Sequence, residues 1–162
     1  MAEKRKDGGR DSRSGTITVN RKAFHDYEIL EKVEAGVVLT GTEIKSAREG
    51  RVNIRDAYAR EEKGEMWLYN AHISQYDKGN RNNHEPERPR KLLLHRWQIR
   101  ELSDKARQRG GTIVPLAMYL KRGMAKLELG VARGRKSYDK RQAIATRDAQ
   151  REMARAVRHS DR

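Results

Sequence analysis

Apolar and polar residues alternate along several short stretches of this chain between residues 16 and 132. The clearest stretch is MAKLELGVA (124–132), in which Leu127, Leu129 and Val131 fall on one side. Successive side chains of a strand point to opposite faces, so these three residues are expected to face a core. The polar neighbours and Gly130 are expected to face water. The pattern therefore predicts an amphipathic strand.

Other stretches predict further strands. DYEILEKV (26–33) and AGVVLTG (35–41) read as two strands joined by a turn at 34–36, since glycine adopts a positive φ at low cost. RDAYAREE and EMWLYNAHISQY predict a hairpin with its turn at Lys63-Gly64. TIVPLAMYLK (112–121) is the expected partner of 124–132, with Pro115 at an edge or a bulge because proline donates no ladder hydrogen bond.

Two segments predict helices. TEIKSAREG (42–50) is short and stops at Gly50, and 95–110 carries Ile99, Leu102 and Ala106 at helical spacing before Gly110. Residues 77–90 read as a polar loop. Six or seven short strands with two helices predict a mainly β protein: a small, closed or partly closed barrel. The expected organisation is a disordered basic arm (1–15), the barrel (16–132) and a basic tail (133–162).

Charge changes the picture more than any single motif. The 162 residues include 37 Lys and Arg against 23 Asp and Glu, giving a net charge of +14 and a pI near 10.3. Such a field concentrates polyanions, and each phosphate contact gains entropy through counterion release. Nucleic acid is the favoured partner; solubility alone and an acidic lipid surface are the alternatives, the latter without a lipidation signal or a broad apolar helix face.

The tail carries ten Lys or Arg and four Asp or Glu after residue 132. On a helix, five arginines fall within an arc of about 80°: Arg147, Arg151, Arg155, Arg158 and Arg162. Like charges four residues apart repel, so an isolated helix is marginal. The sequence predicts a tail that is disordered when free and helical when bound to a polyanion.

Signs of catalysis are missing from the sequence. The five histidines are scattered, and no nucleophile elbow, phosphate-binding glycine loop or dinucleotide motif occurs. His25 and Asp26 would point to opposite faces of a strand and would not cooperate. No cysteine is available for a disulfide or a thiolate metal site, and no apolar run approaches membrane-spanning length. We therefore expect a cytoplasmic protein without enzymatic activity, metal, cofactor or membrane span.

Binding chemistry is better represented. NRKAFHDY (20–27) groups cations with rings that could stack on a base, although Phe24 is expected in the core. Lys45 and Arg48 share a helix face, for which ordinary solvation is an equal alternative. In RPRKLLL (88–94) the cations can contact phosphate, while Leu92 and Leu94 are expected in the core. Glu34, an acid at a predicted turn of a basic protein, could accept from a base amino group or a 2′-hydroxyl.

Several long stretches together resemble one family, the SsrA-binding proteins, which are the bacterial partners of transfer-messenger RNA. They are NRKAFHDYEI, EAGVVLTGTEIKSAREGRVNIRDAYA, GEMWLYNAHIS, EPxRPRKLLLH and TIVPLxMYLKRGxAKLELGVARGRKxYDKR. The resemblance runs from Asn20 to the C-terminus. It implies an antiparallel β-barrel of the oligonucleotide-binding type with two or three flanking helices. It also implies an adaptor that binds the tRNA-like domain of transfer-messenger RNA and delivers the alanyl-charged RNA, with elongation factor Tu, to the A site of stalled 70S ribosomes.

The resemblance also implies site residues. Asn20, Glu34, Leu93 and Lys126 match family positions that support RNA binding by the barrel. With the cations and rings found above, the predicted barrel site comprises Asn20, Lys22, His25, Glu34, Lys45, Arg48, Arg90, Lys91, Leu93 and Lys126. The tail residues expected at the decoding centre, against small-subunit ribosomal RNA, are Gly134, Arg135, Lys136, Tyr138, Asp139, Lys140 and Arg141. Those expected in the message channel are Arg147, Arg151, Arg155 and Arg158.

A few positions depart from the family pattern. Tyr138 stands where many members have histidine, and Arg135 and Ile44 replace a common lysine and valine. Residues after Ala143 vary in the family. A structural ribosomal or assembly protein with a basic extension, and an RNA-modifying enzyme with a barrel module, are the alternatives. For the adaptor, a monomer is expected.

Overall fold

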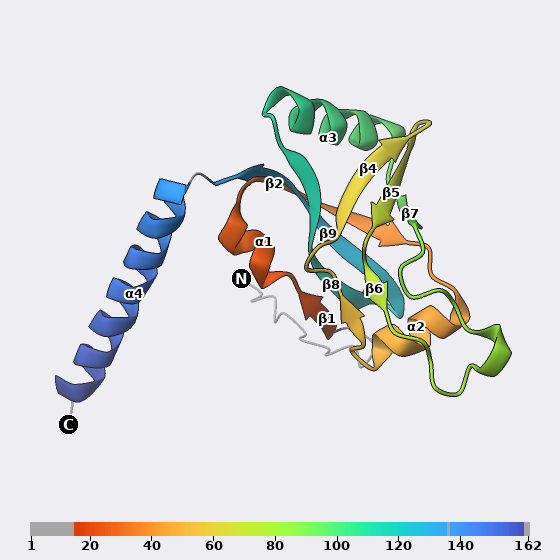
Figure 1. Cartoon of the computed structure of the whole chain (residues 1–162), viewed down its shortest axis with the longest axis horizontal. Coiled ribbons are helices and arrows are strands. Elements are labelled where there is room, and N and C mark those ends of the chain that lie inside the picture. The colour runs from red at the N-terminus through yellow and green to blue at the C-terminus, as the bar shows by residue number, and fades with distance from the viewer. Residues whose placement is uncertain (1–14, 136, 161–162) are drawn as a thin grey trace, which may run out of the picture.

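The computed structural model describes residues 15–135 and 137–160 and is shown in Figure 1. Its elements, in chain order, are β1 (Gly15–Val19), α1 (Arg21–Asp26), β2 (Tyr27–Val37), α2 (Gly41–Arg48), β3 (Val52–Asn53), β4 (Tyr58–Glu62), β5 (Glu65–Tyr69), β6 (His72–Ile73), a 3-10 turn η1 (Asn80–Asn82), β7 (Arg90–Leu93), α3 (Arg96–Gln108), β8 (Thr112–Lys121), β9 (Met124–Gly134) and α4 (Ser137–Ser160). The predicted arm lies outside the described residues, apart from Gly15 in β1.

The main sheet closes on itself. Its strands run in the order β1-β8-β4-β5-β7-β2-β9, and a further pairing of β9 with β8 joins the two sides. All of these pairings are antiparallel. The predicted antiparallel barrel with flanking helices is therefore confirmed, and closure leaves few strand edges for another chain to pair with.

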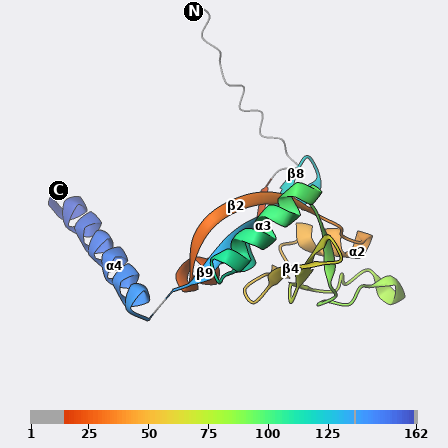
Figure 2. The same cartoon turned by 90° about the horizontal axis from the view of Figure 1, so that it is seen from above.

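The barrel core consists of the inward-facing residues of these strands. Leu127, Leu129 and Val131 are buried in it, as the alternation predicts. Helix α3 lies across one end of the barrel (Figures 1 and 2), and its apolar positions Ile99 and Leu102 join the same core. The helix ends before Gly110, as predicted, with that glycine at φ +60°.

Part of the outer side of β9 is shielded from solvent, contrary to the expectation that Gly130 faces water. A second small core of Ala23, Val114, Leu116 and Ala132 lies there, and Phe24 packs against it. Gly130 is buried beneath the side chain of Leu116. A Cβ on Gly130 would lie 2.8 Å from a methyl carbon of Leu116, so only glycine fits there. The strand expected to hold His25 and Asp26 was also wrong at these two residues. Asn20 caps a helix there instead, with its side chain accepting from the backbone N–H of Ala23.

The predicted turn at 34–36 was wrong as well. Tyr27–Val37 is one strand, β2, which pairs with β9 along its length and bulges between Ile29 and Glu31. Gly36 keeps an extended backbone and pairs with both Leu93 and Lys126. A Cβ there would lie 3.2 Å from the Cβ of Leu93. The glycine therefore permits a close approach of strands rather than a turn.

Most of the other local predictions hold, but the strand predicted over 35–41 ends at Val37 and α2 begins at Gly41. The β4–β5 hairpin turns at Lys63-Gly64, with Gly64 at φ +80°, although the predicted second strand stops at Tyr69. Helix α2 begins with a capping box, in which the Thr40 side chain and Glu43 each accept a backbone N–H of the other. Strand β8 bulges between Pro115 and Ala117, where a proline is tolerated.

The C-terminal segment leaves the barrel at the end of β9. Strand β9 runs to Gly134, and the backbone N–H of Arg135 donates to the Asp26 carbonyl at 3.0 Å. Beyond it α4 stands apart from the barrel in both views (Figures 1 and 2). None of the described helices is long and apolar enough to cross a membrane.

Candidate nucleic-acid interface

A single row of paired residues crosses the outer face of the barrel. Leu93 of β7 pairs with Gly36 of β2, Gly36 pairs with Lys126 of β9, and Lys126 pairs with Tyr119 of β8. Leu93 is 54% exposed although it is a large apolar residue. Because Gly36 has no side chain, Leu93 lies directly over the backbone of β2. The row thus combines an apolar side chain, a cation and a phenol on one surface.

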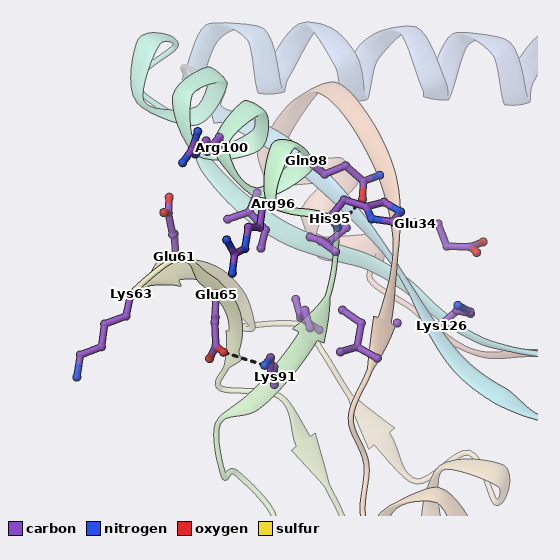
Figure 3. A pocket seen from close by; sticks show the side chains of 16 residues that line it. Glu34, Glu61, Lys63, Glu65, Lys91, His95, Arg96, Gln98, Arg100 and Lys126 are labelled. Atoms are coloured by element: carbon purple, nitrogen blue, oxygen red, sulfur yellow. Dashed lines mark hydrogen bonds and ion pairs between the residues drawn. The ribbon is translucent and has the colours of Figure 1, made fainter.

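A groove of about 930 Å³ opens beside this row, between β2, β7, the β4–β5 turn and the start of α3 (Figure 3). Its charged lining residues are Glu34, Glu61, Lys63, Glu65, Lys91, Arg96, Arg100 and Lys126. Lys91 donates to Glu65 at 2.8 Å, drawn as a dashed line in Figure 3. The cations exceed the acids, so the groove favours an anionic ligand.

Glu34 is an ionised acceptor at the edge of the groove. The Tyr119 hydroxyl donates to Glu34 Oε2, and Lys121 Nζ lies 3.4 Å from Oε1. The hydrogen bond from Tyr119 lowers the pKa of Glu34, with a further contribution from Lys121. Burial and the Glu34 carboxylate in turn raise the pKa of Tyr119. Both groups therefore keep these protonation states at neutral pH, and Glu34 presents a fixed carboxylate.

Replacing Tyr119 with phenylalanine should raise the pKa of the Glu34 carboxyl toward its ordinary value, because the donor that stabilises the anion is removed. A lowered folded-state pKa means that the interaction is present at higher pH and lost as pH falls through that pKa. The variant should therefore lose the carboxylate at a higher pH, as measured by carboxyl ¹³C NMR titration. In the matched control, Tyr69→Phe, the pKa of Glu62 should rise instead. An unchanged Glu34 titration in the Tyr119 variant would contradict the assignment.

Comparison with known proteins decides the family. The sequence profile of the SmpB proteins matches residues 17–159. The chain belongs to the SmpB family. It is 61% identical to the SsrA-binding protein of Carboxydothermus hydrogenoformans over 142 residues, covering 88% of this chain and 95% of that protein. It is 63% identical to the SsrA-binding protein of Desulfitobacterium hafniense, covering 88% and 91%.

A solved structure of the SmpB family agrees with the fold. It is described as "tmRNA-SmpB: a journey to the center of the bacterial ribosome" and is 49% identical to this chain. The superposition has a TM-score of 0.65 and covers 78% of this chain and 93% of the other. The resemblance inferred from the sequence motifs is confirmed.

The residues predicted for the SmpB barrel site do not form one cluster. Glu34, Lys91, Leu93 and Lys126 line the groove together. The others lie elsewhere on the surface or inside the protein, as described below. Of the ten predicted barrel residues, those four are the ones that the structure brings to one place.

Two predicted residues lie on α1. Lys22 Nζ pairs with Asp56 at 2.7 Å and is half exposed. His25 Nδ1 lies 2.9 Å from Asp26 Oδ1, so the expectation that these two side chains point apart was wrong. The reason is that residues 21–26 form a helix rather than a strand. Both side chains remain accessible to a ligand on this face.

Two more lie on α2, where both are exposed. Lys45 Nζ stands 5.6 Å from the centre of the Tyr76 ring, in a cation–π contact. Arg48 occupies the last turn of the same helix. Neither lines the groove, so a contribution of these cations to RNA binding needs a ligand that also covers α2.

The prediction for Arg90 was wrong. This arginine is 0% exposed, and its guanidinium donates to Glu43 Oε1 at 2.9 Å and to the carbonyl oxygens of Ala71 and Pro86. No phosphate can reach it, since all three interactions lie inside the protein. The sequence signal failed because β7 alternates, so that Lys91 and Leu93 face outward while Arg90 faces the interior.

Asn20 is also internal, with 1% exposure. Its amide donates to the carbonyl oxygens of Ile54 (3.0 Å) and Pro115 (2.9 Å), while its oxygen caps α1. The side chain thus ties α1 to the barrel. Any support that Asn20 gives to RNA binding acts through the position of α1.

Sequence reasoning missed several groove or rim residues, among them Lys63, His95, Arg96, Arg100 and Tyr119. A signal existed for Arg96 and Arg100, which lie four residues apart and away from the apolar stripe of α3. For Tyr119, no local signal exists, because its neighbour Glu34 lies 85 residues away and depends on strand register.

The predicted tail residues divide into two groups. Gly134 ends β9, and Arg135 is held on the barrel by a bond from its Nε to the Tyr27 carbonyl at 3.1 Å. Lys136 and the side chains of Tyr138, Asp139 and Lys140 lie outside the described residues. The remaining predicted arginines are exposed on α4: Arg141, Arg147, Arg151, Arg155 and Arg158. Disorder of the free tail in solution stays a prediction.

Proposed function

We propose that this chain is an RNA-binding adaptor of ribosome rescue, which binds the tRNA-like domain of transfer-messenger RNA and delivers it to the A site of stalled ribosomes. The observation that carries the proposal is the row of Leu93, Gly36 and Lys126 beside Glu34. Membership of the SmpB family supports the same partner.

The groove supplies the interactions that RNA requires. Its cations neutralise phosphates and release counterions, while exposed Leu93 offers an apolar contact to a sugar or base. The Glu34 carboxylate accepts a hydrogen bond from a base amino group or a 2′-hydroxyl, and the latter would discriminate RNA from DNA. The acid contributes selectivity, because a site built only for attraction to phosphate would exclude it.

The tail serves the second half of the proposed function. Residues 134–141 enter the empty decoding centre against small-subunit ribosomal RNA, and the arginines of α4 line the message channel. The exposed arginine stripe supports this assignment, since RNA surrounds both places. We propose that the tail folds fully only on the ribosome. Tyr138 retains the ability to stack on a base that a histidine would have at this position.

The remaining proposals concern the cell. Delivery takes place in the cytoplasm with elongation factor Tu bound to the alanyl-charged RNA. The chain acts as a monomer, as an adaptor without catalysis or cofactor. No cluster of three His, Asp or Glu residues suited to a metal ion occurs within 15–135 and 137–160.

Recovery of RNA with the tagged protein from a bacterial lysate tests the proposal. Sequencing should find a transcript with a tRNA-like end strongly enriched, and Lys126→Gln should reduce that enrichment severalfold. Arg107→Gln is the matched control, because it removes one positive charge on α3 at a residue that does not line the groove. Recovery of ribosomal RNA without such a transcript would favour the structural ribosomal or assembly protein instead.

A further inference from the structure

Trp97 is exposed on the surface of α3 and is not part of the barrel core. Its side chain is 63% exposed, more than any other aromatic residue in the described part of the chain. On the helical wheel of α3 it lies opposite the core positions Ile99, Leu102 and Ala106. Tryptophan usually buries most of its large surface, so an outward position indicates a contact made with another molecule.

A second ring extends this surface toward the groove. The His95 and Trp97 rings are parallel within 5°, with centroids 6.3 Å apart. His95 itself lines the groove, and its backbone N–H is fixed by Gln98 Oε1 at 2.9 Å. Leu93, His95 and Trp97 therefore form an exposed strip that leads from the groove to the first turn of α3.

The charges beside the strip decide what kind of partner fits. Arg96 and Arg100 of the same helix are exposed and line the groove. The acids on this side of α3, Glu101 and Asp104, have their own partners: Glu101 accepts from Lys105 at 2.6 Å, and Asp104 lies 3.8 Å from Arg107. Arg96 and Arg100, which have no ion-pair partner among the described residues, thus flank an open aromatic face. An apolar protein surface would leave them without partners, whereas a nucleotide supplies both a π face and a phosphate.

We propose that His95 and Trp97 form a stacking platform for an unpaired nucleobase of the bound RNA. The base stacks on the open face of Trp97, and Arg96 and Arg100 hold the adjoining phosphates. This platform rests on the proposed function, because the RNA strand that occupies the groove supplies the base. It adds a contact that depends on an unpaired nucleotide rather than on the shape of a duplex.

Binding of a synthetic tRNA-like-domain transcript to the full chain tests the platform. Trp97→Ala should raise the Kd about tenfold. Trp97→Phe keeps a π face, so its Kd should stay within about threefold of the wild-type value. Trp97→Leu, which is apolar without a π face, should behave like alanine. Because Trp97 is exposed, the melting temperatures should remain close to that of the wild type.

Two further readouts separate stacking from charge. The slope of log Kd against log salt should be unchanged in Trp97→Ala but reduced by roughly one in Arg100→Gln. The chain has two tryptophans. In a Trp67→Phe background, the transcript should therefore quench the fluorescence of Trp97 alone.

The outcomes are distinguishable. If wild type binds the transcript and Trp97→Ala binds it equally well, the platform is overturned and the proposed function stands. If wild type does not bind the transcript, the proposed function fails and the platform with it. Loss of self-association in Trp97→Ala with unchanged RNA affinity would assign this surface to a second copy of the chain and overturn the platform.

Discussion

Replacing Glu43 with glutamine is expected to lower the free energy of unfolding by about 3–5 kcal/mol, the usual cost of breaking a buried ion pair. Glu43 is 0% exposed and accepts four hydrogen bonds: from Arg88 Nε (2.7 Å), Arg88 Nη2 (2.6 Å), Arg90 Nε (2.9 Å) and the Thr40 backbone N–H (2.8 Å). A neutral amide would leave Arg90 buried without its counter-charge. Urea unfolding at neutral pH measures the change.

The same cluster predicts a pH dependence. Burial raises the pKa of Glu43, but the bonds from Arg88 and Thr40 and the charge of Arg90 outweigh it, so the pKa is lowered overall. The carboxylate therefore contributes stability above its unfolded-state pKa, and the contribution is lost as pH falls through the folded-state pKa. The difference between wild type and Glu43→Gln should shrink at acid pH.

A matched surface variant completes the experiment. Glu62 pairs with Arg60 on the exposed side of β4, so Glu62→Gln should change stability little. A Glu43→Gln chain as stable as wild type would contradict the expectation. Because Arg90 opens β7 and Lys91 and Leu93 follow it, loss of the cluster should also weaken RNA binding by disturbing the groove.

Ending the chain at Arg135 is expected to abolish ribosome rescue while leaving affinity for the tRNA-like transcript within about tenfold of wild type. This cut keeps the whole of β9 and the hydrogen bonds of Arg135 to the carbonyl oxygens of Asp26 in α1 and Tyr27 in β2, so the barrel and groove remain intact. The residual weakening comes from the lost positive charge of the tail and should be greatest at low salt. Filter binding measures affinity, and peptide tagging on a message without a stop codon measures rescue.

The full-length Asp139→Asn variant provides the control for charge. It makes the tail more positive, so simple attraction to ribosomal RNA would leave rescue unchanged or improve it. A specific role of the carboxylate in the decoding centre predicts a loss of rescue with normal transcript binding. Normal rescue in this variant would reduce residues 134–142 to non-specific phosphate contacts. A large loss of transcript affinity on truncation would contradict the division between barrel and tail.

Local physical chemistry was sufficient for much of the fold. The alternation at Leu127, Leu129 and Val131, the Gly64 turn and the proline bulge in β8 were all predicted, since each depends on residues close in sequence. The turn at 34–36 was mispredicted because position 36 needs glycine for another reason. Leu93, which is distant in sequence, packs directly against its backbone. A glycine required by a neighbouring strand and a glycine required by a turn look alike in one sequence.

The site shows the same division. Lys91 could be expected from charge, whereas Lys126 and Leu93 were assigned through the family resemblance. A leucine within RKLLL is usually in the core. The sequence could not show that Arg90 is buried while Lys91 is accessible, because this depends on which side chains of β7 point into the barrel. Tyr119 reaches Glu34 only through the pairing of β8, β9 and β2. Register, a property of the assembled sheet, determines these cases.

Strand β9 fixes a length as well as a surface. Lys126 lines the groove near the start of β9 and Gly134 ends the strand. The two are eight positions apart, or at most about 26 Å at the rise of a strand. Because β9 pairs on both sides, this spacing cannot stretch. The strand therefore fixes the distance between RNA bound at the groove and the site on the ribosome that is proposed to bind the tail.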